Sequence, residues 1–249
     1  MKTELSDTHE TEEMMTQNRD MFNSSLPSTS SAPQETSSSS GVREIRIAIE
    51  VGHGGGDPGA LFQPPFNENY EGEYDYWSRH AQTVGDLIYN EFERTKHRLP
   101  IPTELSVRIF NRGNYPSQGK DHGFNAMITA VKAWTPHVAV GLHLNAYNDE
   151  NVLGHLCVKV KTNAEAVALS ARINSRMAGI PHHQRYDTDG STMAWCKVTD
   201  ASVIVEAGFV SSPSDAAFLC YMHKEITEAI ASGIYDYMVD KEYAIRTRA

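Results

Sequence analysis

The sequence of 249 residues has few cysteines, little basic charge and no long apolar run. Its three cysteines, Cys157, Cys196 and Cys220, are far apart and form no CxxC pair, which argues against a disulfide framework and against a thiolate-bound zinc site. We expect them to be reduced, buried residues. The formal net charge is −10 and no basic stripe offsets it, so nucleic acid is not an expected partner.

Segments that would enter or cross a membrane are also missing. No stretch approaches the roughly 20 apolar residues of a membrane span. The opening MKTELSDTHETEEMM lacks the basic start and the apolar run of roughly 7–15 residues that a secretory signal needs. The sequence therefore predicts a protein that is made in the cytoplasm without a visible signal peptide and has no integral membrane segment. Its hydrophobic fraction of 40% is enough for a buried core.

Residues 1–42 differ in composition from the remainder of the chain. They are rich in serine, threonine and glutamate and include the run STSSAPQETSSSSG. Such a segment buries too little apolar surface to offset the entropy lost on ordering, so we interpret residues 1–42 as a flexible tail. The apolar pattern IRIAIEV begins soon after Arg43, and we expect a single folded domain over residues 43–249.

The folded part is predicted to alternate strands with helices. Short apolar runs predict strands at residues 45–51, 106–111, 137–146, 155–160 and 202–209. Apolar side chains at three- and four-residue spacing predict helices at residues 74–92, 124–134, 164–177 and 222–237. The polar segment IPHHQRYDTDGST is interpreted as a loop. This order favours an α/β fold with a largely parallel or mixed twisted sheet flanked by helices.

Three of the predicted strands end in residues that can carry chemistry. His53 follows the first strand in VGHGG, His143 ends another in GLHLNA, and Glu206 ends a third in VIVEAGF. Ligands of open α/β sheets collect outside the carboxyl ends of the strands, so the fold offers a way to bring these residues together. Glu206 directly follows the apolar run SVIV, so we expect it to be partly buried and to need a partner.

Two imidazoles and one carboxylate, with a fourth position left to water, match the open shell of a catalytic zinc site. A glutamate at the first turn of the 74–92 helix, Glu73, is a candidate for the carboxylate. Nitrogen and oxygen donors suit Zn²⁺ and distinguish it poorly from Mn²⁺ or Co²⁺, so Zn²⁺ is the expected ion. Water bound there would have a pKa of about 7. Glu206 could take its proton and later deliver one to a leaving amine.

The residues from about Ile45 to Tyr237 resemble the zinc-dependent N-acetylmuramoyl-L-alanine amidases, a family of bacterial cell-wall amidases and phage endolysins. Three segments carry the resemblance in the family's order: IAIEVGHGGGDPGA, VGLHLNA and VIVEAGFVSSPSDAAFL. The resemblance implies that His53, His143 and an intervening glutamate bind zinc and that Glu206 is catalytic. The phase of the helix that follows selects Glu73 as that glutamate, with Glu71 as the alternative.

The resemblance also implies the reaction: hydrolysis of the amide between the lactyl group of N-acetylmuramic acid and L-alanine in peptidoglycan. Two alternatives stay open, namely a zinc hydrolase of another peptide or amide substrate and a non-catalytic wall-binding protein. Because the substrate lies outside the cytoplasm, release through a pore made by another protein, as for a phage endolysin, or carriage in a virion would reconcile substrate and sequence. The pattern makes no prediction about the oligomeric state.

Other polar residues have weaker cases for a role. Asp57 and Asn145 lie inside the matched segments and either orient the ligands or make turns. His182 and His183 either line a substrate groove or lie on a solvated loop. The chain departs from the family at Ser211 and Ser212, where an asparagine is usual, which leaves the expected metal ligands intact.

Overall fold

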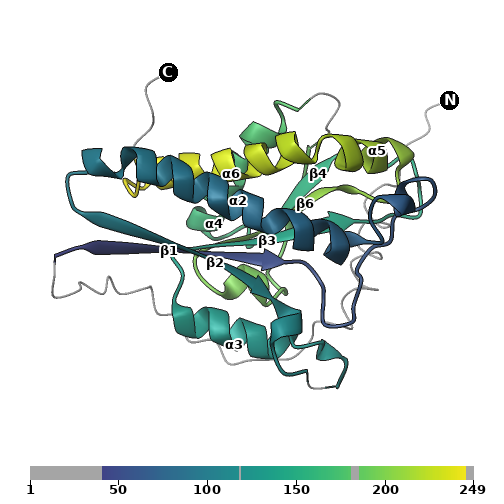
Figure 1. The fold of residues 1–249 in the computed structure, drawn as a ribbon, viewed down its shortest axis with the longest axis horizontal. Helices are drawn as coiled ribbons and strands as arrows, with labels where there is room; N and C mark the ends of the chain where they lie inside the picture. The colour runs from purple at the N-terminus through teal and green to yellow at the C-terminus, as the bar shows by residue number, and fades with distance from the viewer. Residues whose placement is uncertain (1–40, 118, 181–184, 245–249) are drawn as a thin grey trace.

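The computed structural model describes residues 41–117, 119–180 and 185–244 (Figure 1). The tail predicted at residues 1–42 lies outside the described part except for Gly41 and Val42. Within the described residues, six strands form one sheet with the order β2-β1-β3-β6-β4-β5. Five α-helices flank it, so the predicted α/β class is confirmed. The residue ranges of the strands are β1 (Arg43–Val51), β2 (Thr103–Asn111), β3 (Val138–Asn145), β4 (His155–Lys159), β5 (Arg185–Asp189) and β6 (Ala201–Phe209).

The sheet is mixed. All neighbouring strands are parallel except β4 and β6, which pair antiparallel through Leu156–Val158 and Ile204–Glu206. The prediction of a loop at residues 180–192 is wrong in part, because Arg185–Asp189 forms β5. As an edge strand β5 pairs with β4 alone, and backbone hydrogen bonds hold it without the apolar alternation by which a buried strand is recognised.

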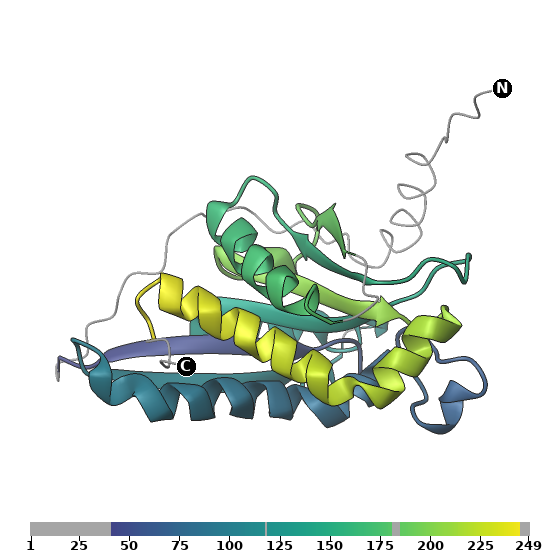
Figure 2. The same cartoon turned by 90° about the horizontal axis from the view of Figure 1, so that it is seen from above.

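The helices cover the two faces of the sheet unequally. Figure 1 shows α3 (Phe124–Trp134) below the sheet and the other helices above it. In Figure 2 the helices of residues 73–95, 223–240 and 164–177 lie side by side over the sheet, in that order. The upper layer consists of α2 (Glu73–Thr95), α4 (Ala164–Met177), α5 (Pro213–Tyr221) and α6 (His223–Asp240). The larger buried apolar cluster lies under this layer and a smaller one lies on the α3 side.

The start of α2 is fixed by packing. Trp77, Ala81 and Val84 are buried at four- and three-residue spacing, as the apolar pattern predicted. The N–H of Glu73 donates to the carbonyl of Ala60 at 2.9 Å, which anchors the first turn. The buried face of the helix therefore sets the direction in which Glu73 points. The helix α5 was not predicted, and Met222, which we placed in the last helix, instead separates α5 from α6.

The carboxyl ends of β1, β3 and β6 lie at one edge of the sheet, on the right of Figure 1. These three strands are neighbours in the sheet and run parallel to one another. His143 of β3 pairs in register with Glu206 of β6. Residues paired in this way point to the same face from backbones that are about 4.8 Å apart. None of the described helices is both long and apolar enough to span a bilayer.

We expect Gly233→Ala to destabilise the protein, because α4 and α6 touch at this glycine. A Cβ at position 233 would lie 2.5 Å from Cα of Ile173, a backbone atom that cannot move as a flexible side chain can. Overpacking of this kind costs about 1–3 kcal/mol of the free energy of unfolding, measurable by urea denaturation. Ser232→Ala on the same helix is the control and should change that free energy by less than about 0.5 kcal/mol. Equal unfolding midpoints for the two variants would contradict this packing.

Candidate metal centre and active site

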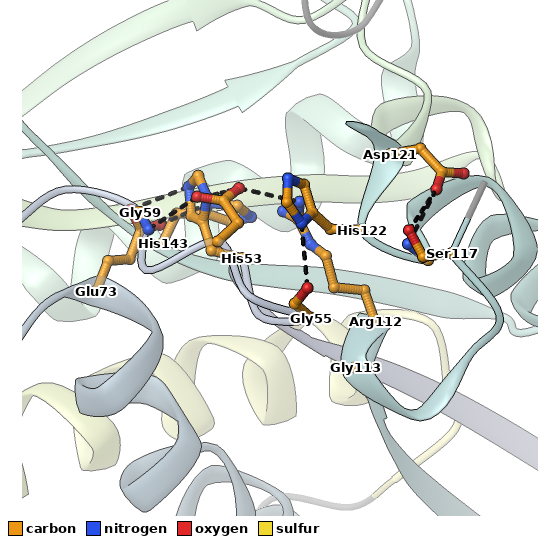
Figure 3. A network of polar contacts seen from close by, with 12 residues as sticks. His53, Gly55, Gly59, Glu73, Arg112, Gly113, Ser117, Asp121, His122 and His143 are labelled. Carbon is orange, nitrogen blue, oxygen red and sulfur yellow. Dashed lines mark hydrogen bonds and ion pairs between the residues drawn. The ribbon is translucent and has the colours of Figure 1, made fainter. Parts of the chain in front are cut away.

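His53 lies in the glycine-rich turn that follows β1 (Figure 3). Its backbone has a φ of 61°, a left-handed conformation that few non-glycine residues adopt and that is frequent at functional sites. The ring Nε2 lies 3.1 Å from Oε2 of Glu73, and Nδ1 lies 2.8 Å from Oδ2 of Asp57. A carboxylate only accepts at pH 7, so Asp57 holds the proton on Nδ1 and leaves Nε2 free to bind a cation.

Glu73 joins the two histidines. Its side chain is buried, with Oε2 facing His53 and Oε1 lying 2.8 Å from Nδ1 of His143. The metal-binding atoms of these three residues lie within 4.8 Å of one another, as one shared cation requires. Glu71, the alternative ligand, is exposed, and the structure does not bring it into this cluster.

Two glycines make room for the cluster. A Cβ at Gly52 would lie 2.9 Å from both Oε1 of Glu73 and Nδ1 of His143. A Cβ at Gly59, whose φ is +69°, would lie 2.6 Å from Oε2 of Glu73. Any larger residue at these positions would push the candidate ligands apart, which explains glycine on both sides of His53.

A second layer of contacts surrounds His53. Asp57 accepts a hydrogen bond from the backbone of Gly59 at 3.1 Å and one from Nη1 of Arg112 at 3.3 Å. The hydrogen bond to His53 is the main cause that lowers the pKa of Asp57 to about 2. Burial lowers the pKa of His53, but the charge of Glu73 and the bond to Asp57 outweigh it and raise that pKa to about 9. The electrostatic field at His53 therefore favours positive charge.

His143 experiences a similar field. Its Nε2 lies 3.6 Å from Oε2 of Glu50, a buried carboxylate of β1, and its Nδ1 faces Glu73. Burial lowers the pKa of His143, whereas the carboxylates of Glu50 and Glu73 raise it well above its usual range. Both imidazoles therefore lie between two carboxylates, one on the cation side and one behind the ring.

Glu206 lies beside the cluster on β6. Burial is the main cause that raises its pKa to about 7, with the nearby charges of His143 and Glu73 acting in opposite directions. Its Oε2 is buried and accepts no hydrogen bond from the described residues. A carboxyl group whose pKa lies near neutrality can accept and return a proton, which is the requirement for a general acid and base.

The residues at this edge fit a divalent cation. Four buried or half-buried carboxylates, those of Glu50, Asp57, Glu73 and Glu206, lie around the two imidazoles, and the guanidinium of Arg112 contacts Asp57. Buried negative charge is costly unless it is compensated, and Oε1 of Glu73 has no hydrogen bond of regular geometry. A divalent ion held by two imidazoles and a carboxylate would supply the compensating positive charge in place of the two imidazole protons and leave a coordination position for water.

The other predicted residues are placed as follows. The side-chain oxygen of Asn145 accepts a hydrogen bond from the N–H of the next residue, Ala146, a contact local to the end of β3. His182 and His183 lie outside the described residues.

Sequence reasoning missed three residues, Glu50, Arg112 and His122. His122 lies beside the glycine-rich turn that contains His53, and its Nδ1 is 3.1 Å from the carbonyl oxygen of Gly55 in that turn. The signal for Glu50 was a carboxylate within the apolar strand IRIAIEV; His122 had none, because it lies in a polar loop.

A mixed α/β sheet that presents an open His-Glu-His donor set beside a buried carboxylate at its strand ends is typical of metal-dependent hydrolases. The sequence matches the N-acetylmuramoyl-L-alanine amidase family over residues 47–236, most of the folded part. The chain belongs to this family. It is therefore an amidase that acts on peptidoglycan, the bacterial cell-wall polymer.

Solved structures share the fold. The catalytic domain of the amidase CwlV from Bacillus (Paenibacillus) polymyxa var. colistinus is 14% identical, with a TM-score of 0.57, over 80% of this chain and 99% of that one. The CwlD amidase of Clostridioides difficile, solved with the GerS lipoprotein, is 19% identical, with a TM-score of 0.58, over 79% and 99%. The catalytic domain of the CD27L endolysin targeting Clostridia difficile is 16% identical, with a TM-score of 0.53, over 79% and 97%. No curated protein sequence matches the chain.

Binding of a divalent cation should release protons at neutral pH. With a pKa of about 9, His53 is protonated at pH 7.5 in the metal-free protein, and a cation must displace that proton. Calorimetric titration with Zn²⁺ in buffers of different ionisation enthalpy should give at least one proton per ion at pH 7.5 and fewer above pH 9. Exposed His97→Gln is the control and should release the same number.

The same pKa sets the pH dependence of the metal-free protein. The folded-state pKa of His53 exceeds its ordinary value of 6.5, so its ion pairs stabilise the metal-free fold fully below pH 6.5. That stabilisation is lost as the pH rises through about 9. Zn²⁺ binding without proton release at pH 7.5 would contradict the pKa of about 9 for His53, on which both predictions depend.

Proposed function

We propose that the protein is a zinc-dependent N-acetylmuramoyl-L-alanine amidase that hydrolyses the amide between the lactyl group of N-acetylmuramic acid and L-alanine. His53, Glu73 and His143 are the proposed zinc ligands, and Glu206 is the proposed general acid and base. The observation that carries the proposal is the convergence of these three donors within 4.8 Å, with Glu206 in register beside His143.

Zinc is proposed from the chemistry of the donors. Imidazole nitrogen and carboxylate oxygen in an open shell are typical of catalytic zinc, whereas structural zinc sites are usually closed by cysteine. The three cysteines support this choice, because all are buried and none belongs to the His-Glu-His cluster. Asp57 holds the ring of His53 in the orientation and tautomer that a ligand needs.

The proposed mechanism assigns the proton transfers to Glu206. Zinc, when bound, supplies a Lewis acid that polarises the scissile carbonyl and acidifies the attacking water. The Glu206 carboxylate takes one proton as the water oxygen bonds to the carbonyl carbon. It then delivers that proton to the L-alanine nitrogen as the carbon–nitrogen bond breaks. A pKa of about 7 suits both transfers, since each form of the carboxyl is populated near neutral pH.

We further propose that residues 43–249 form the catalytic domain and that residues 1–42 are a tail. The substrate is in the wall, and we propose that the enzyme reaches it by release through a pore made by another protein or as part of a virion. Similarity to an endolysin catalytic domain supports the first route. Protein produced inside bacteria should lyse them only after the membrane is permeabilised; lysis without permeabilisation would exclude the need for such a pore.

Purified protein incubated with peptidoglycan should release new L-alanine amino termini without new reducing sugar ends. Glu206→Gln should keep one zinc per chain and lose about 10²–10⁴-fold in kcat, because only the proton carrier is removed. Exposed Glu71→Gln is the matched control and should retain both zinc and rate.

Three results would count against this scheme. Loss of zinc from Glu206→Gln would make Glu206 a ligand rather than the acid and base. Cleavage of small peptide amides but not of wall would favour another amide substrate. Binding to the wall without cleavage would favour a non-catalytic role.

A further inference from the structure

Glu50 is a buried carboxylate without a hydrogen bond. It lies near the end of β1 with 1% of its surface exposed, and among the described residues no group donates a hydrogen bond to Oε1 or Oε2. A buried ionised group in this state costs several kcal/mol of folding free energy unless a nearby charge compensates it. A residue of this kind in an apolar strand therefore needs an explanation outside the packing of the core.

The group that faces Glu50 is the ring of His143. Oε2 lies 3.6 Å from Nε2, on the side of the ring opposite to the nitrogen that faces Glu73. Glu50 pairs in register with Gly141, two residues before His143 on β3, so both side chains lie on the same face of the sheet. The strands themselves thus direct this carboxylate at His143.

Gly141 provides the space for the carboxylate. A Cβ at position 141 would lie 2.9 Å from Oε2 of Glu50 and 3.2 Å from Nε1 of Trp195. Trp195 does not donate to Glu50, because its Nε1 donates to the carbonyl of Val203. The pocket therefore accommodates the carboxylate without giving it a hydrogen bond.

The carboxylate behind the other histidine has a different environment. Asp57 accepts hydrogen bonds from Gly59 and Arg112 besides its contact with His53, so Asp57 also holds the loop together. Glu50 has no such second partner among the described residues. The candidate ligand in contact with Glu50 is His143, so an effect of Glu50 on metal binding acts first on that ring.

We propose that Glu50 is a positioning residue whose charge, 3.6 Å from Nε2 of His143, keeps the proton of the neutral ring on that nitrogen and thereby presents the Nδ1 lone pair to the metal. A neutral imidazole carries its proton on one nitrogen and a lone pair on the other. A carboxylate behind Nε2 selects the tautomer whose lone pair is on Nδ1, the atom that lies 2.8 Å from Glu73. The inference depends on the proposed metal centre.

The experiment compares zinc affinity with the stability of the metal-free protein. Glu50→Gln keeps the shape of the side chain and removes its charge. We expect the Kd for Zn²⁺, measured by competition with a chromogenic chelator, to rise about 10–100-fold. When loaded with Co²⁺, the Glu50→Gln variant should show visible absorption bands that are shifted from those of the wild-type protein. The melting temperature of the metal-free variant should change little, because the ring of His143 keeps its contact with the Glu73 carboxylate when Glu50 loses its charge.

Asp236→Asn is the matched control, because Asp236 is also buried but pairs with Arg176 at 2.7 Å between α6 and α4. This variant should lower the melting temperature and leave the zinc Kd of the folded protein unchanged. The opposite pattern in the two variants would separate a role in positioning a ligand from a role in folding. Glu50→Met, of similar length and apolar, replaces Glu50→Gln if the latter does not fold and should weaken zinc binding in the same direction.

Two negative results have different meanings. If wild-type protein binds zinc and Glu50→Gln binds it equally well with the same Co²⁺ spectrum, the role of Glu50 is overturned and the metal centre stands. If wild-type protein binds no zinc at all, the proposed metal centre fails, and the role of Glu50 fails with it. A lower melting temperature of metal-free Glu50→Gln with unchanged Kd would make Glu50 a structural residue.

Discussion

The site depends on one buried carboxylate that joins three parts of the fold. Glu73 begins α2, contacts His53 after β1 through one oxygen and contacts His143 of β3 through the other. The helix layer and the sheet are thereby tied at the edge where chemistry takes place. The packing of Tyr76 and Trp77 sets the phase of α2, so the apolar core determines where this carboxylate points. The packing that stabilises α2 is therefore also the packing that fixes the position of Glu73.

The site is assembled as a series of alternating charges. Arg112 contacts Asp57, Asp57 contacts His53, and Glu73 lies between the two histidines. Glu50 closes the series behind His143. Each carboxylate that is removed from water faces a group that carries or can carry positive charge, which is how a protein keeps so many acidic side chains at one buried edge. Glu206 differs, because burial dominates its environment and leaves its protonation balanced near neutral pH.

Much of this arrangement could be predicted from the sequence. Burial requires the apolar runs of β1, β3 and β6 and the helical spacing of α2, so these elements could be predicted. Parallel strands bring their carboxyl ends together, so the strand-end positions of His53, His143 and Glu206 could be anticipated as well. The strand β5 could not, because its pairing uses the backbone and leaves no apolar pattern. The contact of Glu50 with His143 depends on the register between β1 and β3, which no local pattern encodes. Arg112 and His122 approach through loops whose course is set by tertiary contacts.

Gly141 has a consequence for how this chain can change over evolutionary time. The space that its missing Cβ leaves is occupied by the end of the Glu50 side chain. A lineage that acquires alanine at position 141 must shorten or move the side chain at position 50. A lineage that shortens the side chain at position 50 loses the closest contact that favours glycine at position 141, and only the contacts of an added Cβ with Trp195 and Ile204, at 3.2 and 3.3 Å, remain. The two positions should therefore covary among relatives, although neither is a candidate metal ligand and they lie ninety-one residues apart.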